Sequence, residues 1–366
     1  MDIPFIDLGL HHSPFKKEIL KAIEEIMDSG SYLDGASVRA FESEFAAANA
    51  VKHCLAVANG TEALRIGLLA CDIGPGDEVI TATNTFIATL EAIALTGARP
   101  VLVDVDKSAC MAPEKLEAAI TSKTKIIMPV HLYGQCADMD PINEIAEAHG
   151  LTVFEDAAQA HFSEYKGRLA GTMSKLAAFS FYPTKNLGTI GQGGCILTDS
   201  DEIASSISML RNHGQYPKYE HKIIAGNARM QEIPARVLSI ELPYLKEWNA
   251  RRIAIARDIR THLKTLPGVV AVAERGDGLH NYHVLCAHFD KRDFVQEELS
   301  KRGIVAARHY PIPCHLQEGY AYLGYKKGDF PVSEWQAERL LSLPIYPEMT
   351  GKQVEFLKSS LSEILA

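Results

Sequence analysis

The sequence predicts an α/β fold: a mainly parallel seven-stranded sheet with helices on both faces, followed by a smaller C-terminal α+β domain. Three observations lead to this prediction. Short apolar runs alternate with helical segments over the first two-thirds of the 366 residues, which is typical of a parallel sheet. The runs are almost continuously apolar, as in strands covered on both sides. After about residue 232 the sequence changes to a long helical stretch rich in Ala, Arg and Leu.

The individual elements follow in chain order. A helix is predicted over 14–29, ahead of the sheet. The seven predicted strands are 53–58, 78–81, 100–105, 125–131, 151–156, 176–181 and 194–199. Helices are predicted between most of them, among others at 61–71, 113–119 and 141–149.

The C-terminal third has its own pattern. It is predicted to contain one long helix or a broken pair over 233–266, a strand over 281–289, and helices over 294–303, 333–341 and 351–365. We therefore divide the chain into 1–232, the N-terminal helix and large α/β domain, and 233–366, the long helix and small domain.

The composition excludes several classes of protein. A net charge of −9 and a pI near 5.9 disfavour sequence-independent binding to nucleic acid, which needs a basic surface. No apolar run approaches the ~20 residues that cross a bilayer, and the first residues do not resemble a signal peptide. Seven scattered cysteines without a Cys-x-x-Cys pair are typical of a reducing compartment. We expect a cytoplasmic protein with no nucleic-acid or membrane partner.

Lys185 is the first candidate for chemistry. It lies in Ser180-Phe-Tyr-Pro-Thr-Lys185-Asn-Leu-Gly188, between the end of a predicted strand and a Gly-rich turn at 191–194. Apolar and aromatic neighbours favour the neutral amine, which is a nucleophile. A lysine in a solvated loop could have the same neighbours, so the other motifs must decide between these interpretations.

Asp156 ends another predicted strand, at the carboxyl edge where open α/β sheets bind their ligands. It could hold a protonated pyridine nitrogen there, or simply cap the next helix. Gln159, three residues further on, could donate to a ring hydroxyl or face solvent.

Two more strand ends carry candidate ligand-binding residues. Gly60 permits close backbone approach and Thr61 adds a hydroxyl at a helix start, which suits a phosphate, although the same residues also make a plain turn and cap. Phe86 could stack on a flat ring or pack into the core. A lysine nucleophile, a carboxylate, a phosphate-binding helix start and an aromatic ring at one sheet edge are the parts that pyridoxal 5′-phosphate (PLP) requires.

Six motifs together resemble the nucleotide-sugar aminotransferases of the DegT/StrS type, which are PLP-dependent enzymes of the aspartate-aminotransferase-like fold type I. In chain order these motifs are NGTEAL, TNTFIAT, EDAAQAH, SFYPTKNLG, GNARM and HYPIPCHLQ. They span essentially the whole chain, in the order and spacing of that family.

The resemblance implies a role for each motif residue. Lys185 would bond to the aldehyde of the cofactor and carry the proton between cofactor and sugar, while Asp156 would pair with the pyridine nitrogen. The resemblance also implies that Gln159 contacts the ring hydroxyl and that Phe86 stacks on the ring face. Gly60, Thr61 and Ser180 would hold the phosphate, and Asn227 of the partner subunit would add one more contact to it. The active sites would therefore be shared across a homodimer.

The resemblance also implies the sugar contacts. Tyr182, His309 and Tyr310 are the candidates, with Tyr219 of the partner subunit reaching in. The arginines that could meet the diphosphate or a carboxylate are Arg211 and Arg229, although either could be an ordinary surface residue.

Three residues depart from what the family usually carries: Phe162 replaces Gly, Gln192 replaces an acidic residue and Pro234 replaces Gln. Phe162 puts in doubt the shape of the pocket wall, and Gln192 puts in doubt the contact that the acidic residue would make. Pro234 puts in doubt where the long helix starts. Catalytic activity is still expected, because neither Lys185 nor Asp156 is affected. No metal site is expected, because the two histidines of RHYPIPCHLQ lie on a proline-broken loop without a zinc spacing.

The resemblance implies transfer of an amino group from glutamate to a nucleotide-linked keto sugar. It favours a dTDP-3-keto-6-deoxyhexose, giving a dTDP-3-amino sugar for lipopolysaccharide, S-layer glycan or antibiotic pathways. A 4-keto or UDP-linked sugar stays open as an alternative. A PLP-dependent sugar dehydratase is disfavoured, because such relatives carry histidine in place of Lys185. A non-catalytic regulator is disfavoured because the sequence has no added DNA-binding segment or basic arm.

Overall fold

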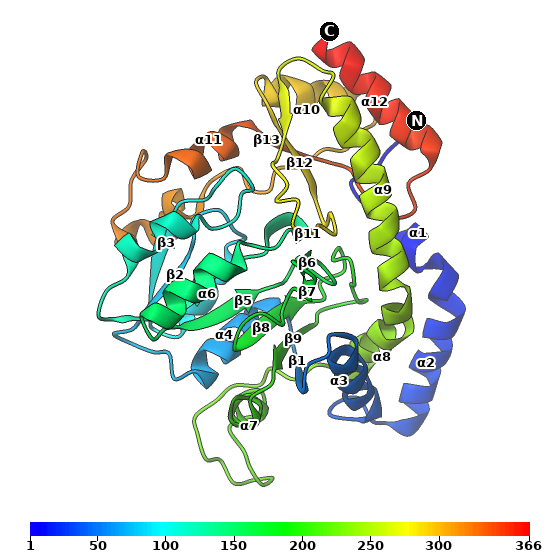
Figure 1. Ribbon diagram of the computed structural model, residues 1–366. Helices are drawn as coiled ribbons and strands as arrows, with labels where there is room; N and C mark the ends of the chain where they lie inside the picture. Colours follow the sequence, from blue (N-terminus) through cyan, green and yellow to red (C-terminus); the bar gives the residue numbers. More distant parts are fainter.

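The computed structural model describes residues 1–366 and contains a seven-stranded sheet in the order β1-β9-β8-β5-β4-β2-β3 (Figure 1). The strands are β1 (His53–Val57), β2 (Glu78–Ala82), β3 (Arg99–Val103), β4 (Thr124–Met128), β5 (Thr152–Asp156), β8 (Leu176–Ser180) and β9 (Gly194–Thr198). All seven predicted strands are confirmed. Strand β9 runs antiparallel to both of its neighbours, and the other pairs are parallel. The predicted α/β fold with a mainly parallel sheet is therefore confirmed.

Helices cover both faces of this sheet. One face packs against α4 (Gly60–Ala70), α5 (Ala88–Leu95) and α7 (Asp201–Leu210). The other face packs against α3 (Ala36–Ala48), α6 (Met139–Ala148) and α8 (Glu232–Glu241). Consecutive strand residues alternate between the two cores, since Val153 lies in one and Phe154 in the other. This two-sided burial explains why the strands are almost continuously apolar.

A smaller antiparallel sheet, in the order β10-β12-β13, lies beside the long helix α9, where Figure 1 labels β12 and β13. It consists of β10 (Val269–Ala271), β12 (Leu285–Phe289) and β13 (Leu340–Leu343). Its core of 20 buried residues includes side chains of α9 (Leu245–Leu263), α10 (Arg292–Lys301) and α12 (Gly351–Leu365). A third sheet joins β11 (Gly278–Leu279), β6 (Glu164–Tyr165) and β7 (Arg168–Leu169). The division into 1–232 and 233–366 stays a prediction.

The N-terminal segment contains α1 (Leu8–His12), the 3₁₀ turn η1 (Ser13–Phe15) and α2 (Lys16–Ser29). The predicted long helix is the broken pair: α8 and α9 are separated by the 3₁₀ turn η5 (Leu242–Tyr244). The break falls at Pro243, which has no backbone N–H to donate to a helix. None of the helices combines the length and the apolar character that crossing a bilayer requires.

Three element predictions need correction. Residues 113–119 form two 3₁₀ turns, η2 (Pro113–Lys115) and η3 (Glu117–Ala119), and not an α-helix. The strand predicted over 281–289 begins only at Leu285, because the amides of Asn281 and Val284 donate to the loop at Tyr133 and Gly134. The helix predicted over 333–341 is α11 (Pro331–Arg339), and the residues after it enter β13. The remaining 3₁₀ turns are η4 (Leu132–Gly134), η6 (Cys314–Leu316) and η7 (Glu318–Leu323).

Candidate active site at the carboxyl edge of the sheet

Four of the predicted motifs follow the carboxyl ends of β1, β2, β5 and β8. Strands β2, β5 and β8 lie in one parallel run, and β1 has the same direction because both it and β8 are antiparallel to β9. The four strand ends therefore meet at one edge of the sheet, where α/β proteins bind ligands.

The end of β1 and the end of β8 form a tight backbone cradle. A Cβ at position 60 would lie 2.7 Å from the Cβ of Ser180, so only glycine fits there. A Cβ at Gly194 would likewise lie 2.4 Å from the carbonyl carbon of Asn59. Helix α4 begins at Gly60, and the Asn59 side chain accepts a hydrogen bond from the Glu62 amide at 2.9 Å. A glycine-lined helix start beside a serine hydroxyl is suited to a phosphate.

Asp156 is buried at the end of β5, with 4% of its surface exposed. Its Oδ2 accepts a hydrogen bond from the Thr89 hydroxyl at 2.8 Å, and its Oδ1 accepts one from the Ala158 amide at 3.2 Å. Burial raises the pKa of Asp156, while the Thr89 hydroxyl, the Ala158 amide and the charge of Lys185 oppose that rise. Because a carboxylate can accept about four hydrogen bonds, capacity remains for an N–H of a protonated heterocycle.

Lys185 is half-buried in a turn after β8. Its backbone amide donates to the carbonyl of Tyr182 at 2.8 Å, and the next side chain, Asn186, donates to Asn249 Oδ1 of α9 at 2.8 Å. Burial lowers the pKa of Lys185 to about 8, and the negative charge of Asp156 opposes this shift. The lysine thus has a neutral, nucleophilic fraction near neutral pH.

Tyr133 links the predicted ring contact to the predicted sugar loop. Its amide donates to Gln159 Oε1 at 2.6 Å, and its hydroxyl donates to the backbone carbonyl of His309. Gln159 Nε2 donates in turn to the Tyr310 hydroxyl at 3.2 Å. The half-exposed ring of Phe86 lies 5.6 Å from the ring of Tyr310. The structure therefore brings four of the predicted residues together.

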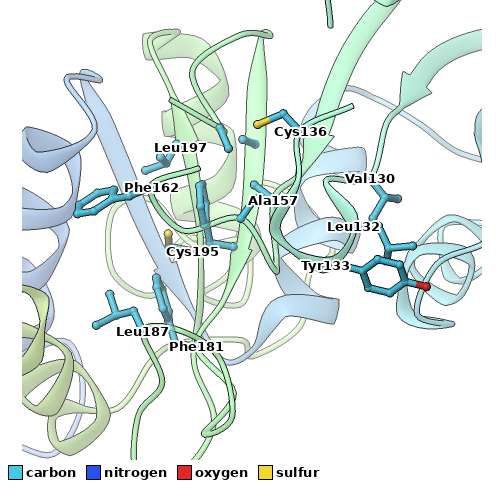
Figure 2. Packing of buried hydrophobic residues seen from close by; sticks show 14 of the residues in the cluster. Val130, Leu132, Tyr133, Cys136, Ala157, Phe162, Phe181, Leu187, Cys195 and Leu197 are labelled. Atoms are coloured by element: carbon cyan, nitrogen blue, oxygen red, sulfur yellow. The ribbon is translucent and has the colours of Figure 1, made fainter. Parts of the chain in front are cut away.

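Tyr133 and Thr89 contact candidate site residues and were not predicted from the sequence. Thr89 lies in the quoted motif TNTFIAT, four residues after Thr85, and their hydroxyls are 2.8 Å apart. This spacing could have placed both on one side of a turn. Tyr133 has a φ of 61°, which is unusual for a residue other than glycine. In Figure 2 its hydroxyl points away from the core residues Phe162 and Phe181.

Other predicted residues lie apart from this cluster within the chain. Tyr219 and Asn227 lie on the long loop between α7 and α8, which extends away from the body of the molecule (Figure 1). Tyr219 is 78% exposed, and Asn227 is exposed and contacts Arg229 of its own loop at 3.0 Å. Tyr182, at the edge of the cradle, is 48% exposed.

The two predicted arginines have partners inside the chain. Arg211 donates to the carboxylate of Glu42 and to the carbonyl of Ala56, the latter at 2.7 Å. Arg229 pairs with Asp34 at 3.1 Å. A diphosphate would have to compete with these carboxylates, most of all at Arg211, whose side chain is largely buried.

The unusual residues are accommodated locally. Phe162 has a φ of 53°, a conformation that glycine adopts without strain and that a bulky residue rarely adopts. Pro234 lies in the first turn of α8, where a missing N–H costs no helical hydrogen bond, so the helix begins normally at Glu232. Gln192 is exposed on the Gly-rich turn.

The fold and this edge define the class of protein: an α/β enzyme whose candidate ligand site contains a lysine and a buried carboxylate. The chain belongs to the DegT/DnrJ/EryC1/StrS aminotransferase family, whose model matches residues 14–362. The resemblance found in the motifs is thereby confirmed.

Curated relatives match along the whole chain. The dTDP-3-amino-3,6-dideoxy-alpha-D-galactopyranose transaminase of Aneurinibacillus thermoaerophilus is 43% identical over 96% of this chain and 97% of its own. The UDP-N-acetyl-3-dehydro-alpha-D-glucosamine 3-aminotransferase of Acidithiobacillus ferrooxidans is 42% identical over 96% and 95%. A protein of Geobacillus stearothermophilus named pleiotropic regulatory protein is 41% identical over 99% and 98%.

Solved structures agree with the family. The crystal structure of DesV from S. venezuelae, in complex with a ketimine intermediate, superposes with a TM-score of 0.97 at 41% identity and covers 99% of this chain and 98% of its own. NtdA from Bacillus subtilis, solved with bound PMP, has a TM-score of 0.92 at 28% identity and covers 100% and 85%. The fold is that of fold-type-I enzymes, the cofactor is PLP, and the protein is an aminotransferase. The cradle, the buried carboxylate and the lysine described above fit the phosphate, ring nitrogen and aldehyde of this cofactor.

Proposed function

We propose that the protein transfers an amino group from glutamate to a nucleotide-linked keto sugar, with a dTDP-3-keto-6-deoxyhexose as the preferred acceptor. The observation that carries the proposal is one sheet edge at which the Gly60 cradle, buried Asp156 and Lys185 follow strands of the same direction. The 3-keto position is supported by the names of the relatives. A UDP-linked acceptor stays the second candidate, because the UDP-sugar and dTDP-sugar relatives are 42% and 43% identical to this chain.

Each residue of the edge has a proposed task toward the cofactor. When bound, PLP supplies an electron-withdrawing ring that accepts electrons from the substrate carbon. Asp156 keeps a negative charge opposite the ring nitrogen, and Gln159 orients the ring hydroxyl. Lys185 would attach the cofactor and, when released, would take and return the proton at its Nζ.

The remaining cofactor contacts hold the two ends of the ring system. The cradle of Gly60, Thr61 and Ser180 would hold the phosphate, because helix α4 presents its free amides there. Phe86 would cover one face of the cofactor ring. The Phe86 side chain is 53% exposed, so its own ring is accessible to a ligand. Tyr182, His309 and Tyr310 contact the sugar from the same side.

A homodimer with shared active sites is the proposed assembly. The loop between α7 and α8 exposes several apolar side chains, and Ile224 is fully exposed at 102%. Such a surface is typical of one that a partner covers. In the dimer, Tyr219 and Asn227 of the partner subunit would complete the sugar and phosphate contacts.

A mixing experiment tests the assembly. Lys185→Ala and Asn227→Ala variants are each purified, partly unfolded together and refolded. If sites are shared, heterodimers carry one intact site, and about a quarter of wild-type activity returns at equal mixing. If mass spectrometry confirms heterodimers and no activity is recovered, the sites are not shared.

Covalent mapping and donor dependence test the chemistry. Borohydride reduction of the holoenzyme followed by peptide mass mapping should place the cofactor on Lys185. Glutamate should release 2-oxoglutarate in proportion to aminated dTDP-3-keto sugar, and less rapidly with the UDP-linked analogue. Product formed without glutamate would instead indicate a dehydratase.

We also propose a cytoplasmic location. Its support is that all seven cysteines are free, and six of them are buried. The amino sugar made there would enter lipopolysaccharide or a related glycan. Fractionation of the source cells with an antibody against the chain would test the location.

A further inference from the structure

Two consecutive histidines lie beside a buried glutamate, outside the candidate active site. His11 and His12 end helix α1, and Glu241 is the last residue of α8. Each of the three offers a ligand atom, and these atoms lie within 4.8 Å of one another. His12 Nδ1 is 2.7 Å from Glu241 Oε1, and His11 Nδ1 is 2.8 Å from Glu348 Oε1.

The glutamate of this cluster is incompletely satisfied. Glu241 has no exposed surface, yet its second oxygen, Oε2, has no hydrogen-bond partner. A buried carboxylate oxygen without a partner destabilises the fold, because it has lost its hydrogen bonds to water and no protein donor replaces them. The geometry therefore leaves an acceptor free beside two imidazoles.

The sequence predicts no metal site, but it does not reveal this grouping, and we propose that His11, His12 and Glu241 bind a divalent transition-metal ion of the zinc class. Two imidazoles and one carboxylate are a common zinc ligand set, with water in the fourth position. Glu348, which already pairs with His11, would orient that imidazole as a second-sphere carboxylate does. The His12 side chain is 18% exposed, so an ion can enter from solvent.

Binding requires only a small adjustment. The His12–Glu241 pair is 2.7 Å apart, whereas two ligands of a tetrahedral ion with bonds of ~2.0 Å lie roughly 3.3 Å apart. The ion would join α1 to the end of α8, next to the break at Pro243. Since this site forms only in the folded chain, a bound ion should raise the melting temperature.

Trp248 provides a local reporter. Its ring centroid is 4.3 Å from that of His11, and the second tryptophan, Trp335, lies against His288 and Arg339 instead. In a tag-free holoenzyme carrying Trp335→Phe, Co²⁺ should quench the Trp248 fluorescence with saturation at one equivalent per chain. Zn²⁺, which is diamagnetic, should displace Co²⁺ and reverse the quenching.

Matched variants decide the assignment. His12→Gln should weaken Co²⁺ and Zn²⁺ binding at least ~100-fold, and His11→Gln should do the same. His53→Gln is the control, because His53 pairs with Asp201 at 2.6 Å but has no second imidazole beside it. Circular dichroism and the cofactor absorbance confirm that each variant is folded. Absence of saturable quenching in folded wild-type protein, or equal binding by His12→Gln and wild type, would overturn the proposal.

Discussion

The cofactor residues and the sugar residues of the candidate site are held very differently. Asp156 is buried with two hydrogen-bond donors, and Gly60 lies so close to Ser180 that a Cβ at position 60 would not fit. Tyr182 and Tyr219 are 48% and 78% exposed, and the phenol of Tyr219 makes no hydrogen bond within the chain. The cofactor half lies mostly in one chain, with only Asn227 proposed to come from the partner subunit, whereas the sugar half is open.

This difference indicates a division of labour. Chemistry common to aminotransferases needs fixed geometry, which strand ends provide because they are part of the core. Substrate choice rests on loops, whose side chains can change without disturbing the sheet. Variants should therefore separate into those that abolish the reaction and those that only weaken substrate binding.

The largest effect is expected from Asp156→Asn. The neutral amide cannot balance a protonated ring nitrogen, so kcat should fall by about 10²–10³-fold, as when one preorganised electrostatic contact is removed. Steady-state kinetics with saturating PLP would measure this fall. Asp199→Asn, at an exposed position after β9, serves as the control. Wild-type kcat in Asp156→Asn would show that the ring is balanced by another group.

Gly60→Ala should act on cofactor affinity. The new Cβ would lie 2.7 Å from the Cβ of Ser180, so the cradle must widen and the phosphate contacts lengthen. We expect the Kd for PLP to rise about 10–100-fold, equal to roughly 1.4–2.8 kcal/mol. Titration of apoenzyme with PLP measures it. Gly319→Ala, which meets no atom within 4 Å, should bind PLP normally. Unchanged affinity in Gly60→Ala would place the phosphate elsewhere.

Thr89→Val sharpens the comparison through pH. The Thr89 hydroxyl lowers the pKa of Asp156 against the effect of burial, so its removal raises that pKa. The carboxylate is then protonated at higher pH, and the acid limb of the kcat profile should move upward, with kcat there about tenfold lower. Thr85→Val should move the acid limb less, because the Thr85 hydroxyl contacts Thr89 and not Asp156 itself. An acid limb that stays fixed would exclude Asp156 as the group that titrates.

The strands were predictable, and so was the meeting of the candidate cofactor residues at one sheet edge, because both depend on local sequence. Continuous apolar runs indicate two-sided burial, and residues directly after parallel strands must share an edge. Lys185, Asp156 and Gly60 follow from this rule. The break at Pro243 was predicted only as an alternative, since proline marks an interruption without saying whether the helix kinks or stops.

The supporting contacts were not predictable, because they join distant parts of the chain. Tyr133 donates to a carbonyl 176 residues further on, and Asn186 donates to a side chain 63 residues away. The hydrophobic pattern indicates that such polar residues lie near the core. It does not indicate which residue provides their hydrogen-bond partner. The end of α11 was misplaced for a related reason: Leu340–Leu343 pairs with β12, and this long-range pairing overrides local helix preference.

Tyr219→Phe should give the smallest effect and tests the open half of the site. The phenol is proposed to reach the sugar of the partner's site, so its loss should raise KM for the keto sugar a few-fold and leave kcat and the KM for glutamate unchanged. Tyr216→Phe is a matched control, because Tyr216 lies on the same loop and is 72% exposed. Equal KM values in both variants would remove Tyr219 from the sugar site. A lowered kcat would show that the loop also orders the reacting groups, and the two halves would then be less separate than their burial indicates.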